Sequence, residues 1–148
     1  MKDTRQVNIF LAEDNMADVW LLEEALKRQG LNYRLYHYSN AEDAIVAAKA
    51  IGSADCPIPD LMLVDFNLPR GYGRDVLAAA ATNPILAAVP KAVMSSFLRQ
   101  EELEQAMKLG ALCFIPKPTG LEAFLTTVGA KVTELLGSST VGISPAAH

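Results

Sequence analysis

The sequence has few of the features that mark secreted, membrane or metal-thiolate proteins. Its only two cysteines, Cys56 and Cys113, lie far apart and form no CxxC motif, so we expect two reduced thiols that serve as packing residues. No apolar run is long enough to cross a bilayer, and the polar start MKDTRQ does not resemble a signal peptide. These absences lead us to expect a cytoplasmic protein.

Basic charge is also scarce. The 13 lysines and arginines are dispersed among 17 acids, which gives a formal charge of −4. Nucleic-acid modules usually carry a clustered basic face, so we do not expect that function. Of the 148 residues, 51% are apolar and 20% are charged, as in an ordinary domain with one core. We expect a single domain over residues 1–136, a flexible tail over residues 137–148, and no output domain.

Short apolar runs alternate along the chain with stretches that carry helix signals. The runs favour strands over residues 7–11, 33–38, 61–64, 91–94 and 112–115. The helices are expected from Asp14-Asn15 to about residue 29, from a capping box at residues 39–42 to about residue 51, and over residues 75–82, 99–109 and 121–136. Five such βα units predict an α/β fold, a doubly wound five-stranded parallel sheet with helices on both faces.

Polar side chains stand where four of these strands end. Glu13 and Asp14 follow the first strand, Asp65 the third, Ser95 closes the fourth, and Lys117 follows the fifth. Because the carboxyl ends of parallel strands border one crevice, we expect these side chains to meet there.

The expected cluster suits a small divalent cation. Three carboxylates in one place repel each other unless a cation is present. Mg²⁺ prefers oxygen ligands, and two carboxylates, the Asn67 carbonyl and waters would supply them. Such an ion can clamp phosphoryl oxygens during in-line transfer, with Lys117 as a point charge and Ser95 as a hydroxyl donor.

In this arrangement the chain resembles the receiver domain of two-component response regulators. The matching motifs, in order, are Glu13-Asp14, the acceptor motif DFNLP at residues 65–69 with Gly73 beyond it, VMSS at residues 93–96 and FIPKP at residues 114–118. The resemblance covers about residues 7–136. It implies the flavodoxin-like (βα)5 fold with strand order 2-1-3-4-5. The long loop before the central strand and the lack of an output domain are similar to stand-alone, CheY-like regulators paired with bacterial phytochromes.

The resemblance also implies a role for each site residue. Asp65 would accept a phosphoryl group from a sensor histidine kinase or a phosphotransfer protein. The Mg²⁺ ligands would be Asp14, Asp65 and the Asn67 carbonyl, with Glu13 acting through water. Ser95 and Lys117 would hold the phosphoryl group, Phe114 would change rotamer together with Ser95, and the Lys117–Pro118 peptide would be cis.

The output is implied to lie on the face formed by residues 99–109, 112–115 and 121–136. A downstream protein partner would bind this face, and a homodimer would form through it. The protein would be a switch that assists its own phosphorylation and dephosphorylation, and not an enzyme acting on a free metabolite.

Several residues depart from the family pattern. Tyr72 stands before Gly73 where an acid is common, Pro116 precedes Lys117, and Ser95 replaces the commoner threonine. Phe97, two positions after Ser95, is bulky for a place that tunes dephosphorylation in the family. These residues leave the phosphoryl lifetime and the switching amplitude open.

Other functions fit part of the pattern. A phosphorylation-independent interaction module could keep the same acids. A small flavin-binding protein would share the wound topology, but the turn AEDNMAD after the first strand is acidic and lacks glycine, so it would repel a phosphate. His37 is better interpreted as a partly exposed strand histidine than as a phosphate relay, and Trp20 as a residue packed at the rim of the domain.

Overall fold

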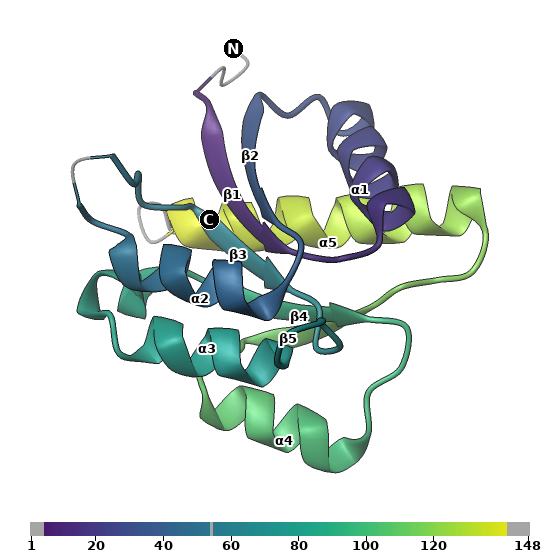
Figure 1. The fold of residues 1–148 in the computed structure, drawn as a ribbon. Helices are drawn as coiled ribbons and strands as arrows, with labels where there is room; N and C mark the ends of the chain where they lie inside the picture. The colour runs from purple at the N-terminus through teal and green to yellow at the C-terminus, as the bar shows by residue number, and fades with distance from the viewer. Residues whose placement is uncertain (1–4, 54, 142–148) are drawn as a thin grey trace.

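The computed structural model describes residues 5–53 and 55–141, with side chains described as far as Gly137. Five parallel strands form one sheet in the order β2-β1-β3-β4-β5 (Figure 1). The strands are β1 (Val7–Ala12), β2 (Tyr33–Tyr38), β3 (Leu61–Val64), β4 (Lys91–Ser95) and β5 (Cys113–Pro116). The helices are α1 (Met16–Arg28), α2 (Ala41–Ala50), α3 (Gly73–Ala81), the 3₁₀ helix η1 (Pro84–Ala88), α4 (Gln100–Lys108) and α5 (Leu121–Val141).

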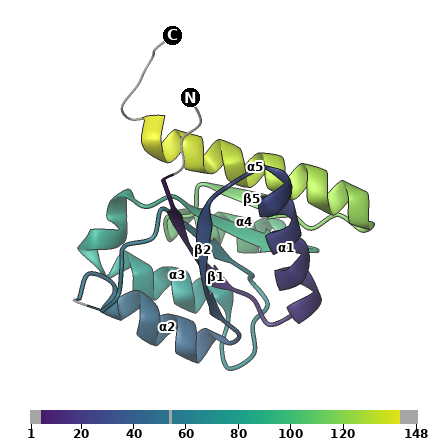
Figure 2. The same cartoon turned by 90° about the horizontal axis from the view of Figure 1, so that it is seen from above.

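The sheet separates two apolar cores. Along β1, Phe10 and Ala12 face the core under α2, α3 and α4, while Ile9 and Leu11 face the core under α1 and α5. This alternation is what a strand with a period of two produces when both of its faces are covered. Figure 2 shows α1 and α5 on the opposite side of the sheet from α2 and α3. The predicted fold and strand order are confirmed.

Several details of the secondary structure differ from the sequence expectation. The cap of α2 is Asn40, whose side chain accepts the Asp43 N–H at 2.8 Å, so the expected capping box does not form as written. The segment before β4 contains η1, where a loop was expected. Helix α5 continues to Val141, past the expected end at Leu136, and Gly137 lies within it instead of ending it. The rest of the expected tail, residues 142–148, lies outside the described residues.

The turn after β3 is held in place by a glycine. A Cβ on Gly73 would clash with the Asp65 carbonyl oxygen and the Phe66 Cα, so only glycine lets α3 begin this close to the strand end. The Gly73 N–H donates to the Phe66 carbonyl at 2.9 Å. This close approach fixes the backbone on which Asp65 stands.

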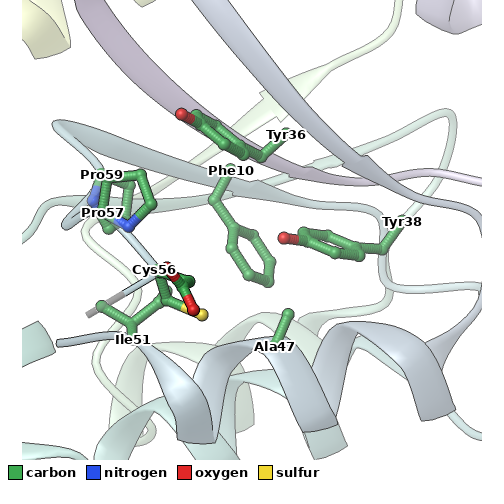
Figure 3. A pocket seen from close by; sticks show the side chains of 9 residues that line it. Phe10, Tyr36, Tyr38, Ala47, Ile51, Cys56, Pro57 and Pro59 are labelled. Carbon is green, nitrogen blue, oxygen red and sulfur yellow. The ribbon is translucent and has the colours of Figure 1, made fainter. Parts of the chain in front are cut away.

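A small cavity lies between β2, α2 and the long loop before β3 (Figure 3). It encloses about 60 Å³, with the rings of Phe10 and Tyr38 packed 4.8 Å apart on one side and Cys56 in the loop opposite. Cys56 and Cys113 are both free thiols of intermediate burial, as expected of packing residues. Over the parts of the chain that the structure describes, no helix is long and apolar enough to cross a bilayer.

Candidate functional site

The strand ends form a polar pocket at the carboxyl edge of the sheet. It encloses about 230 Å³ and is lined by Glu13, Asp14, Asn15, Asp18, Asp65, Asn67, Ser95, Ser96 and Lys117. Every site residue expected from the sequence lines this pocket except Phe114. Phe114 is half-buried on β5 and packs against the core under α2, α3 and α4.

Lys117 forms ion pairs with three of the acids that line the pocket. Its Nζ lies 2.7 Å from Glu13 Oε1, 2.8 Å from Asp18 Oδ2 and 2.7 Å from Asp65 Oδ2. Burial alone would lower the pKa of Lys117, but the hydrogen bonds to Asp18, Asp65 and Glu13 outweigh burial and raise that pKa above its ordinary value. The ammonium therefore stays charged and offsets part of the acidic cluster.

Glu13 is fully buried, and the pKa of its carboxyl group is raised. Burial raises the pKa of Glu13 to about 7, the Lys117 ammonium opposes this shift, and the Asp65 charge adds to it. The Asn15 N–H donates to Glu13 Oε2 at 3.1 Å. Glu13 Oε1 lies 2.7 Å from Lys117 Nζ. The His37 ring lies with Nε2 2.7 Å from the Glu13 carbonyl oxygen and so ties β2 to this turn.

The acidic cluster fits a hard divalent cation. One carboxylate oxygen each from Glu13, Asp14 and Asp65 can be chosen so that all three lie within 4.8 Å of one another. Asp14 is exposed, whereas Glu13 and Asp65 are buried. Several carboxylates around one point are the donor set that Mg²⁺ or Mn²⁺ prefers.

Asp65 and Ser95 are both held by backbone contacts. Asp65 Oδ1 accepts the Asn67 N–H at 2.9 Å, while Oδ2 contacts Lys117. The Ser95 hydroxyl donates to the Phe97 carbonyl at 3.0 Å, and the Ser95 carbonyl accepts the Lys117 N–H at 2.9 Å. The Ser95 hydroxyl is therefore hydrogen-bonded within its own loop and has no hydrogen bond to Asp65.

Two expectations need revision. The expected cis peptide at Lys117–Pro118 is wrong, because the structure has no cis peptide within residues 5–53 and 55–141; trans is the preferred isomer even before proline, and the Lys117 side chain reaches the acids in that isomer. Sequence reasoning also missed Asp18. Its place in the first turn of α1, three residues after the Asn15 cap, is the signal that could have placed it near the end of β1.

The family model for the response regulator receiver domain matches residues 9–129. The chain therefore belongs to the receiver domains of two-component response regulators. It is 30% identical over 115 residues to the response regulator Rcp1 of Synechocystis sp., covering 77% of this chain and 78% of that protein.

Two solved structures are similar over nearly the whole chain. The phosphorylated cyanobacterial phytochrome response regulator RcpA has a TM-score of 0.75 and 29% identity, covering 96% of this chain and 97% of that one. The Mn²⁺-bound form of the response regulator Rcp1 has a TM-score of 0.72 and 26% identity, covering 94% and 96%. The expected similarity to phytochrome-associated regulators is thus confirmed.

Proposed function

We propose that Asp65 accepts a phosphoryl group from a sensor histidine kinase or a phosphotransfer protein while Mg²⁺ is bound by the acidic cluster. The observation that supports this proposal most directly is the Lys117 ammonium, which lies 2.7 Å from Asp65 Oδ2 and 2.7 Å from Glu13 Oε1. Such a group can hold a transferred phosphoryl oxygen beside the acceptor carboxylate.

In the transfer, an Asp65 oxygen attacks phosphorus. The new P–O bond forms as the P–N bond of the donor phosphohistidine breaks, and the neutral imidazole leaves after taking up a proton. Asp14, Asp65 and the Asn67 carbonyl would hold the cation, with Glu13 acting through water. When bound, Mg²⁺ neutralises charge on the carboxylates and on the phosphoryl oxygens.

The switch follows from the new charge on Asp65. A phosphoryl group adds roughly −1.5 to −2 charges, and Lys117 pairs with it. The Ser95 hydroxyl leaves the Phe97 carbonyl, to which it now donates at 3.0 Å, and donates to a phosphoryl oxygen. Phe114 then changes rotamer together with Ser95, and the face formed by α4, β5 and α5 changes its affinity for a downstream partner or for a second copy of the chain.

RcpA is a phytochrome response regulator. The similarity of this chain to RcpA supports a phytochrome histidine kinase as the sensor that phosphorylates this receiver. We propose a cytoplasmic location because the phosphoryl donor and the output partner would be found there. Together these assignments define a phosphoacceptor switch.

The acceptor role is tested with a small phosphodonor. Incubation of the full chain with acetyl phosphate and Mg²⁺ should add one phosphoryl group that is stable in acid and labile in base, as measured by intact mass. Asp65→Asn should abolish the gain, chelation of Mg²⁺ should prevent it, and Asp55→Asn, an exposed acid outside the pocket, should leave it unchanged. A gain that survives Asp65→Asn would refute the acceptor role, and no gain at all would favour a phosphorylation-independent interaction module.

A further inference from the structure

A second buried lysine lies at the other end of β4 from Ser95. Lys91 is the first residue of the strand and is 5% exposed. Its Nζ donates to the Leu86 carbonyl at 2.7 Å and to the Val89 carbonyl at 3.0 Å. Both carbonyls belong to η1 and the turn after it, so the chain folds over the lysine.

No carboxylate balances the charge of Lys91. Its side chain takes part in none of the ion pairs formed within residues 5–53 and 55–137. A lysine ammonium has three N–H donors, and the two carbonyls use two of them. Burial lowers the pKa of Lys91, as expected of a cation removed from water without a counter-ion.

Lys91 also lines a cavity at the amino edge of the sheet. The cavity is open to solvent, has a volume of about 230 Å³ and is bordered by Ala87, Ala88, Val89, Pro90, Lys91, Gly110 and Leu112. Leu112 is 55% exposed and stands at its solvent side. The lining side chains other than Lys91 are aliphatic, so the lysine supplies the charge of the site.

We propose that this cavity binds a short aliphatic carboxylate. Its carboxylate accepts the third N–H of Lys91, and its hydrocarbon chain lies against Ala88, Pro90 and Leu112. A carboxylate suits the site because an anion near a buried ammonium is attracted more strongly than in water. A phosphate would bring more oxygens than one ammonium can satisfy, and desolvating them would cost free energy. The aliphatic walls favour the chain through burial of apolar surface.

This site is separate from the acidic pocket and does not depend on its function. The two cavities share no lining residue, and they lie at opposite ends of the strands. Failure of either proposal would therefore leave the other unaffected.

The proposal is tested by titrating the ¹⁵N-labelled full chain with sodium butyrate and, separately, with 1-butanol. Saturable shifts are expected at the amides of Lys91, Gly110 and Leu112 with butyrate. The affinity for the neutral alcohol should be at least about tenfold weaker, because a hydrogen bond to a charged group is lost. Lys91→Met should weaken butyrate binding by at least about the same factor. Lys108→Met, the loss of an exposed lysine on α4, should leave butyrate binding unchanged.

The comparison of butyrate with butanol uses the unmodified protein, so it decides the question even if Lys91→Met folds poorly. Equal responses to the acid and the alcohol would refute the role of the ammonium. The absence of saturable shifts at these three amides would refute the site, and so would full butyrate affinity in a folded Lys91→Met variant.

Discussion

Two buried lysines stand at opposite edges of the sheet, and their partners give them opposite properties. Lys117 contacts three carboxylates, and its pKa is raised. Lys91 contacts two backbone carbonyls and no acid, and its pKa is lowered. The Lys117 side chain is 7% exposed and Lys91 is 5% exposed, so burial does not distinguish them. The comparison teaches that the partners, and not burial alone, decide whether the pKa of a buried ammonium in this fold is raised or lowered.

The largest expected effect is the loss of Lys117. Lys117→Met leaves Glu13 and Asp65 buried without their cation, and breaking such a pair should lower the free energy of unfolding by about 3 kcal/mol. Lys91→Met should change it by less than about 1 kcal/mol, because the removed cost of burying charge offsets the lost hydrogen bonds. Urea denaturation of both variants at pH 8 in chelator measures the difference.

The pH dependence shows whether the acids cause the Lys117 effect. In the native protein the pKa of Glu13 is raised from 4.5 to about 7, and without the ammonium it should rise further. The folded variant then binds protons that the unfolded chain releases as the pH rises above 4.5, so its stability falls with increasing pH. We expect the deficit of Lys117→Met to be smaller at pH 5 than at pH 8. Millimolar Mg²⁺ should also reduce it, and a deficit unaffected by both would contradict this account.

A smaller effect is expected from Asp18, the site residue that sequence reasoning missed. Asp18 Oδ2 lies 2.8 Å from Lys117 Nζ, with 18% of its side chain exposed. Asp18→Asn keeps the size of the side chain and removes its charge, which should cost about 1 kcal/mol of unfolding free energy after discounting for solvent. The matched control is Asp55→Asn, which changes an exposed acid outside the acidic pocket in the same way. Urea denaturation should show a loss for the first variant and little change for the second. Equal effects would contradict the assigned role of Asp18.

The sequence was sufficient to predict the sheet and most of the acidic pocket. Asp65 follows a run of four buried residues, and the other expected pocket residues also stand at strand ends. In a parallel sheet all of these positions face one edge. Local pattern and topology therefore agree, and nothing about side-chain packing was needed to place them.

The residues that were missed depend on helix phase and on packing between distant segments. Helix α1 begins at Met16, directly after the Asn15 cap. This start sets the direction in which the first turn of α1 points, and so brings Asp18 to the pocket. The sequence predicts that Lys91 begins a strand, and a lysine at the start of a strand is usually exposed. It is buried because η1, which was expected to be a loop, places the Leu86 carbonyl within 2.7 Å of its Nζ.

The smallest expected effect is the pH dependence contributed by Lys91. Burial lowers its folded-state pKa below the ordinary 10.5, so between these two values the unfolded chain binds a proton that the folded protein has released. The stability contributed by Lys91 should therefore rise as the pH rises through this window and level off above 10.5.

The measurement is the difference in unfolding free energy between the native protein and Lys91→Met, taken by urea denaturation from pH 7 to pH 10. Other groups that titrate in this range are common to both proteins and cancel, so the difference isolates Lys91. It should increase with pH, whereas Lys108→Met, which removes an exposed lysine, should give a smaller change. A difference that decreases with pH would mean that an undetected anionic partner raises the pKa of Lys91, and the contrast with Lys117 would then disappear.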